Sequence, residues 1–82
     1  MLDERTKELV AIGASIVANC QPCLEYHTAK ARELGAATEE ILAAVDVGKQ
    51  VRRGAAAKMD RFATEHVTGQ SVSVPPAGCE CQ

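Results

Sequence analysis

The sequence predicts an all-α fold: a small domain of three or four helices that is completed by oligomerisation. Apolar residues recur at helical spacing along the body of the chain, and we predict no strand. The flanking residues are typical of helix boundaries, with Asp3 and Thr38 as candidate N-terminal caps and Gly35 as a helix-ending glycine.

The first helix is expected to run from Asp3 to about Ala18, where Asn19 interrupts the pattern. Its apolar residues at helical spacing are Leu9, Val10, Ile12, Ile16 and Val17. A second helix is expected from near Pro22 to Gly35, because proline is favoured in the first turn of a helix and glycine just after its end.

After Thr38, one apolar stripe continues for an unusual length. Its members are Ile41, Val45, Gly48, Val51, Ala55, Met59 and Phe62. The stripe predicts either one long helix to about Glu65 or two helices that meet near Gly54 in phase. Gly48 and Gly54 each weaken a helix by about 1 kcal/mol relative to alanine, so the sequence leaves this choice open.

From Val67 onward the helical pattern stops, and the composition becomes that of a linker rich in Ser, Gly and Pro. We therefore expect a helical domain over residues 1–66 and a flexible tail over residues 67–82. The tail ends in a Cys-x-Cys pair, Cys79 and Cys81.

Composition and charge limit the classes of partner. The net charge of −2 and the lack of a basic cluster argue against nucleic-acid binding. No stretch approaches the roughly 20 apolar residues that span a bilayer, and the charged N-terminus lacks a secretory signal, so we expect no membrane partner and a cytoplasmic location.

In a reducing cytosol, cysteines are more often redox-active or metal-bound than a structural framework. With one Tyr, one Phe and no Trp, the helices bury little area, so we expect self-association to complete the core.

The most informative motif is Cys20-Gln-Pro-Cys23, followed four residues later by His27. A cysteine at a helix N-terminus lies at the positive end of the helix dipole, which favours the nucleophilic thiolate over the thiol. An imidazole one turn further along faces the same way and can take or return a proton. The structural alternative is that both cysteines merely pack against a neighbouring helix while His27 is solvated.

Glu8 is a further candidate because it borders the apolar face of the first helix. It can be a rim carboxylate paired with Arg5 or Lys7, or it can reach the CxxC centre. In an antiparallel hairpin of the first two helices, Glu8 lies roughly 15 Å and His27 roughly 9 Å from the turn. Side-chain length or a tilted crossing can bridge this difference, so contact between Glu8 and His27 is feasible. Direct contact between Glu8 and Cys23 is less so.

The tail cysteines Cys79 and Cys81 allow three interpretations. They can be inert, or they can form a second redox pair that exchanges with the CxxC, since a flexible linker of about 12 residues spans roughly 20 Å. The third is a zinc site with four thiolates, from Cys20, Cys23, Cys79 and Cys81. The one-residue gap and the tethered second pair count against this zinc site, so we expect no metal and no cofactor.

Glu8, Cys20, Cys23 and His27 form the ordered pattern E-x11-C-x-x-C-x3-H. In this pattern the chain resembles the AhpD-like alkylhydroperoxidases of the carboxymuconolactone decarboxylase superfamily. The flanking segments LDERTKELVA and LGAATEEIL fit as well, and the resemblance covers roughly residues 2–62.

The resemblance implies an all-helical homo-oligomer, a trimer or hexamer, whose CxxC reduces hydroperoxides. It implies that Cys23 is the peroxidatic thiol and that Cys20 resolves the resulting sulfenic acid to a disulfide. Glu8 and His27 match the family's proton-relay residues. The implied electron donor is a dithiol of the thioredoxin or lipoyl type.

Two features bear on how far the family pattern applies. Pro22 stands where the best-studied members have a histidine directly before the second cysteine, which removes one proton donor or acceptor. The decarboxylase branch lacks the cysteine pair, so lactone decarboxylation is disfavoured for this chain. The alternative function is a thiol carrier or metal-handling protein that uses the CxxC and the tail pair with little peroxidase activity.

Overall fold

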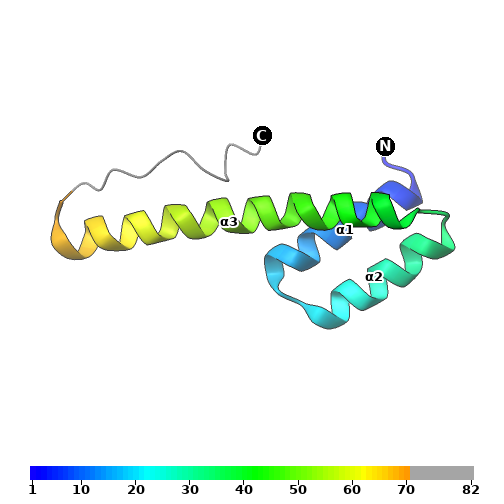
Figure 1. The fold of residues 1–82 in the computed structure, drawn as a ribbon, viewed down its shortest axis with the longest axis horizontal. Coiled ribbons are helices and arrows are strands. Elements are labelled where there is room, and N and C mark those ends of the chain that lie inside the picture. Colours follow the sequence, from blue (N-terminus) through cyan, green and yellow to red (C-terminus); the bar gives the residue numbers. More distant parts are fainter. Residues whose placement is uncertain (71–82) are drawn as a thin grey trace. The chain divides into compact units, whose positions relative to one another are not determined.

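The computed structural model describes residues 1–70, whose regular structure is three α-helices (Figure 1). These are α1 (Glu4–Ala18), α2 (Gln21–Glu33) and α3 (Thr38–Thr68). The predicted all-α class with three or four helices is confirmed, and α3 is one continuous helix, with no break near Gly54. By its contacts the chain divides into two compact units, Met1–Lys49 and a second that starts at Gln50.

The N-terminus of α1 is capped where the sequence predicted. The Asp3 carboxylate accepts a hydrogen bond from the Thr6 N–H at 2.8 Å, satisfying one of the amide donors that a helix start leaves free. The bonds from Thr6 hold the pKa of Asp3 below its ordinary value.

Helix α2 follows α1 and runs back along it in the opposite direction (Figure 1), and the two helices pack against each other. Pro22 lies in its first turn, as expected. The helix ends just before Gly35, whose φ of 92° is a left-handed conformation that glycine adopts without strain.

Helix α3 begins one residue earlier than predicted, so the expected cap at Thr38 is wrong by one position. The Ile41 N–H donates to the Ala37 carbonyl at 3.1 Å, which makes Ala37 the first acceptor of the helix. Alanine has no capping oxygen. Instead, the Glu40 carboxylate reaches back to accept from the Ala37 N–H at 2.9 Å and also binds the Arg5 guanidinium of α1 at 2.9 Å.

The core of the first unit is small and lies where its three helical segments meet. Its buried apolar residues are Ile12, Ala31, Ala36 and Ile41. Helices α1 and α3 approach closely at Gly13 and Gly48, because a Cβ atom on Gly48 would lie 2.5 Å from the Gly13 carbonyl oxygen. Glycine at position 48 therefore permits a backbone contact that any side chain would block.

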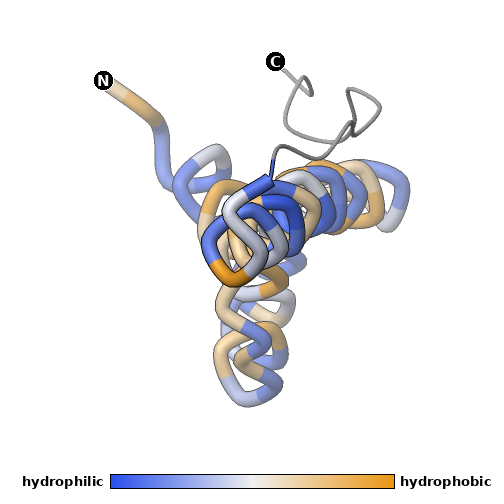
Figure 2. Tube along the Cα trace, turned by 90° about the vertical axis from the view of Figure 1, so that its left-hand side faces the viewer, coloured by the Kyte–Doolittle hydropathy of each residue, from blue (hydrophilic) through white to orange (hydrophobic). Residues whose placement is uncertain are grey.

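In the second unit, α3 continues to Thr68 and ends at Gly69, which has a φ of 75°. An ion pair one turn apart, Arg61 with Glu65 at 3.3 Å, supports this part of the helix. The helices carry apolar and polar segments in alternation (Figure 2). Large apolar side chains of this unit that remain exposed are Val51, Met59, Phe62 and Val67.

Within residues 1–70, no helix combines the length and apolarity that crossing a membrane would require. The division into a helical domain over residues 1–66 and a tail over residues 67–82 stays a prediction.

Candidate active site

The turn between α1 and α2 places both cysteines of the CxxC at the start of α2. Helix α1 stops at Asn19, which takes a left-handed conformation (φ 56°) that asparagine tolerates better than most residues. Cys20 is then the N-terminal cap of α2, and its sulfur accepts a hydrogen bond from the Cys23 N–H at 3.3 Å. Pro22 fits here because the first turn of a helix needs no donor from it.

Cys20 and Cys23 form a disulfide in this structure, with their Cα atoms 5.3 Å apart. That separation lies within the usual range for disulfides. Both residues are partly buried. The start of α2 therefore holds the CxxC in its oxidised form within regular helix geometry.

His27 lies one helical turn beyond Cys23 and is held by a residue of α1. Its Nδ1 lies 2.6 Å from a carboxylate oxygen of Glu8, and the two side chains are 29% and 17% exposed. The contact that hairpin geometry made feasible is thus present. The alternative partners of Glu8 are engaged elsewhere, since Lys7 pairs with Glu4 and Arg5 with Glu40.

This contact determines which nitrogen of His27 is free. A carboxylate accepts hydrogen bonds, so Nδ1–H donates to Glu8 and Nε2 remains able to exchange a proton. The Tyr26 ring packs edge-on against the imidazole at 5.0 Å between centroids, which further restricts its rotation.

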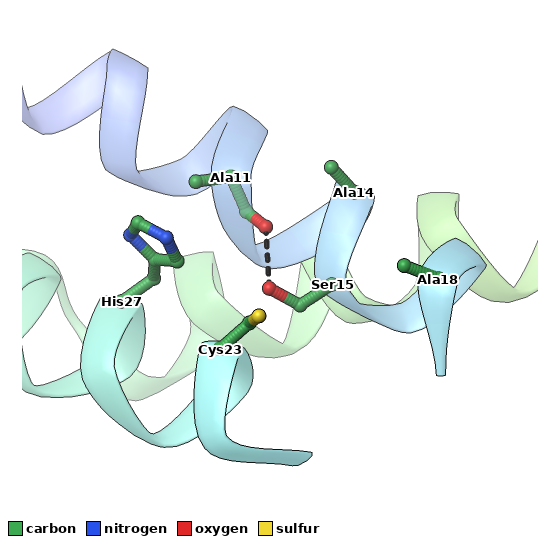
Figure 3. Close-up of a pocket in the computed structure, with 6 residues that line it drawn as sticks. All are labelled: Ala11, Ala14, Ser15, Ala18, Cys23 and His27. Carbon is green, nitrogen blue, oxygen red and sulfur yellow. Dashed lines mark hydrogen bonds between the residues drawn. The ribbon is translucent and has the colours of Figure 1, made fainter. Parts of the chain in front are cut away.

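Cys23 and His27 line one pocket of about 220 Å³ between α1 and α2 (Figure 3). The wall from α1 is made of small residues: Ala11, Ala14, Ser15 and Ala18. Methyl groups leave room beside the sulfur and give the pocket an apolar lining. Of the two cysteines, Cys23 lines it.

Ser15 is a pocket residue that the sequence analysis missed. It is 5% exposed, and its hydroxyl donates to the Ala11 carbonyl at 2.8 Å. A signal was available, because Glu8, Ala11, Ser15 and Ala18 follow one another at helical spacing on one face of α1. That face carries the contact with His27.

The predictions for Cys79 and Cys81 concern residues outside those described. Among residues 1–70, no group of three or more His, Cys, Asp or Glu side chains is placed to hold a metal ion.

Comparison with known proteins bears on the ordered pattern of Glu8, the CxxC and His27. The model of the carboxymuconolactone decarboxylase family matches residues 1–65, which include all four of these residues. The chain belongs to the carboxymuconolactone decarboxylase family. The resemblance noted from the motif is thereby confirmed at the level of the family.

A curated relative of this family member is "Uncharacterized protein 4 in cox locus" from Paracoccus denitrificans. The two are 44% identical over 55 residues, which is 67% of this chain and 50% of the relative. The chain thus spans about half the length of that protein. No solved structure matches the chain.

Membership of the carboxymuconolactone decarboxylase family places the chain in a group that includes enzymes, both decarboxylases and peroxidases. Within this family, the fold described above places a CxxC disulfide at the turn of a two-helix hairpin and a paired histidine and carboxylate where the two helices face each other.

Proposed function

We propose that the chain is an AhpD-like thiol-disulfide oxidoreductase that reduces hydroperoxides through Cys20 and Cys23. The observation that carries this proposal is the shared pocket. It contains the sulfur of Cys23 and the ring of His27, and that ring is held by Glu8 at 2.6 Å. A decarboxylase has no evident use for a disulfide at this point, whereas a thiol peroxidase passes through one in every turnover.

The proposed reaction begins with reduced cysteines and with the proton of the Cys23 thiol transferred to His27 Nε2. The Cys23 thiolate attacks the terminal oxygen of the hydroperoxide, the O–O bond breaks, and the alkoxide leaves as an alcohol after receiving a proton from His27 Nε2. Cys23 is then a sulfenic acid. The Cys20 thiolate attacks its sulfur and displaces hydroxide, which leaves as water with the proton that the Cys20 thiol released, and the disulfide forms. In total, one hydroperoxide is reduced to an alcohol and water while two thiols are oxidised to one disulfide.

Three features support these roles. Cys23 lines the pocket, which favours it as the attacking thiol. Cys20 receives a hydrogen bond from the Cys23 N–H, and this donor also suits a resolving thiolate. Glu8 fixes the histidine by one nitrogen, which leaves the other to carry the proton.

The electron donor in this proposal is a dithiol of the thioredoxin or lipoyl type, which attacks the disulfide and restores both thiols. The same centre then also acts as a disulfide reductase towards partner proteins. Such a donor system is maintained in a reducing compartment, so we place the reaction in the cytoplasm.

We further propose that the chain works as a homo-oligomer, a trimer or hexamer. In the first unit, one large side chain, Ile12, is fully buried. A core of this size stabilises an isolated small domain only weakly. The exposed apolar side chains of α3 offer a surface that further copies can cover.

The test is consumption of an organic hydroperoxide by the full chain with a small dithiol as donor. Cys23→Ser removes the attacking sulfur and should abolish turnover. Cys20→Ser should stop after one oxidation and leave Cys23 as a sulfenic acid or a mixed disulfide, detectable by intact mass. The double variant Cys79→Ser with Cys81→Ser is the matched control and should retain turnover with the small donor. Undiminished turnover in Cys23→Ser would refute the proposal.

A further inference from the structure

The pocket contains a buried hydroxyl that the proposed reaction does not use. Ser15 is 5% exposed and lines the same pocket as Cys23, from the opposite helix. Its hydroxyl donates to the Ala11 carbonyl at 2.8 Å. Figure 3 shows the Ser15 oxygen and the Cys23 sulfur pointing toward one another across the pocket.

The present bond of the Ser15 hydroxyl is easily replaced. In a regular helix the Ala11 carbonyl also accepts the backbone N–H of Ser15, four residues on, so it keeps a partner if the hydroxyl turns away. A hydroxyl hydrogen rotates about the Cβ–Oγ bond while the oxygen stays in place. Redirecting this donor therefore requires no movement of the helix.

Reduction of the disulfide creates a demand for such a donor. In the proposed reaction the Cys23 sulfur is then a thiolate, and the other lining of its pocket is mostly alanine. A charge in apolar surroundings is costly unless it accepts hydrogen bonds. The Cys23 N–H points at the Cys20 sulfur, and of the two nitrogens of His27, Nδ1 is engaged by Glu8 while Nε2 passes its proton to the leaving oxygen in the proposed reaction. Ser15 supplies a hydroxyl from the α1 wall.

We propose that the Ser15 hydroxyl turns from the Ala11 carbonyl to the Cys23 sulfur when the disulfide is reduced, and donates a hydrogen bond to the thiolate. On oxidation the sulfur loses its charge and the hydroxyl returns to the carbonyl. The inference rests on the proposed function in one respect, that Cys23 is the attacking thiol. Ser15 and His27 would then have different roles: the serine stabilises the charge on sulfur and the histidine transfers the proton.

The experiment measures how readily each cysteine ionises in the full, reduced chain. A short pulse of iodoacetamide is applied across a pH series, and the alkylation of Cys23 and Cys20 is followed separately by mass spectrometry of their peptides. In Ser15→Ala, the midpoint of the Cys23 profile should rise by about one pH unit, because a hydrogen bond to a charged group is lost. The Cys20 midpoint, measured in the same digest, should stay in place.

A second pair of variants separates the hydroxyl from the shape of the side chain. Ser15→Thr and Ser15→Val are nearly equal in volume and differ by the hydroxyl, so the threonine variant should have the lower Cys23 midpoint by a similar amount. This pair also serves if Ser15→Ala fails to fold, which circular dichroism reports. The inference would be overturned if wild type and Ser15→Ala, or Ser15→Thr and Ser15→Val, fold and have the same Cys23 midpoint. It would also be overturned if the Cys20 midpoint rose as much as that of Cys23.

These outcomes are distinct from a failure of the proposed function. If the wild-type chain reduced no hydroperoxide but its Cys23 midpoint depended on the hydroxyl, the peroxidase proposal would fall and the hydrogen bond would stand. If the wild-type chain reduced hydroperoxide but the Cys23 midpoint did not depend on the Ser15 hydroxyl, the role of Ser15 would be refuted and the peroxidase proposal would stand.

Discussion

At the scale of single residues, the pair of Glu8 and His27 connects the two helices that form the pocket. Glu8 comes from the second turn of α1 and His27 from the second turn of α2, so the contact exists only when the hairpin is closed. In the proposed reaction this carboxylate fixes the ring through Nδ1 and faces the imidazolium that forms when Nε2 takes a proton. The proposed proton relay would thus be built by tertiary packing.

This arrangement predicts the effect of neutralising Glu8. In Glu8→Gln the side chain keeps its length and an acceptor oxygen, but it no longer stabilises a charged imidazole. The kcat/KM for an organic hydroperoxide should fall by about tenfold or more, because acid–base catalysis depends on that charged state. Stopped-flow kinetics with a dithiol donor measures it.

Glu4→Gln is the matched control for this prediction. Glu4 is a carboxylate of the same helix, one turn earlier, and it pairs with Lys7 on the surface at 3.3 Å. Its neutralisation should leave kcat/KM unchanged. Equal rates for Glu8→Gln and the wild-type chain would exclude Glu8 from the relay.

At the scale of the elements, the site depends on how closely α1 packs against its neighbours. The contact of α1 with α3 is set by two glycines, because a Cβ on Gly48 would lie 2.5 Å from the Gly13 oxygen and 2.8 Å from the Ile16 Cβ. A Cβ on Gly13 would meet the Ala44 oxygen at 3.3 Å, a milder approach. The two positions therefore differ in what they tolerate.

Alanine substitutions at Gly48 and Gly13 should therefore differ in their effect on the stability of the fold. Alanine favours a helix over glycine by about 1 kcal/mol, which would stabilise either variant in isolation. In Gly48→Ala the overlap with backbone forces the helices apart, and overpacking of this kind costs roughly 1–3 kcal/mol or more. We expect a net loss of stability for Gly48→Ala and a smaller change for Gly13→Ala. Urea denaturation followed by circular dichroism measures both, and a Gly48→Ala variant more stable than wild type would contradict the close crossing.

At the scale of the whole molecule, the parts that the sequence predicted are those that local chemistry decides. Asp3 and Gly35 mark the helix ends they were expected to mark, because capping and left-handed backbone depend on few neighbours. The contact of Glu8 with His27 could also be predicted from the sequence, since the rise per residue and an antiparallel hairpin suffice to estimate it.

The parts that were missed depend on contacts between helices. The capping position of α3 is Ala37 rather than the expected Thr38, where the Glu40 carboxylate accepts from the Ala37 N–H while also binding Arg5 of α1. Ser15 is a polar residue in a helix, and only the packing of α2 across it makes it a buried pocket residue. Gly48 was interpreted as weakening its helix, whereas its lack of a side chain is what the crossing requires.

The proposed assembly leads to a prediction for the second unit. Val51, Met59 and Phe62 are 38%, 63% and 60% exposed, and at 100° per residue they lie within about 80° of arc on α3. If further copies cover this face, the wild-type chain should sediment at a multiple of 8.7 kDa. Phe62→Lys should weaken association by about 10- to 100-fold, because a large apolar contact is replaced by a charge.

Asp60→Lys provides the control for that measurement, since residue 60 lies on the opposite side of α3 from Phe62 and the change also introduces a lysine. This variant should keep the wild-type mass in sedimentation velocity. A wild-type chain that sediments as a single copy at micromolar concentration would contradict the proposed oligomer. An unchanged mass in Phe62→Lys would instead move the interface away from this face. If Phe62→Lys does dissociate the assembly, its peroxide turnover per chain shows whether the pocket, which is formed by α1 and α2, needs the assembly.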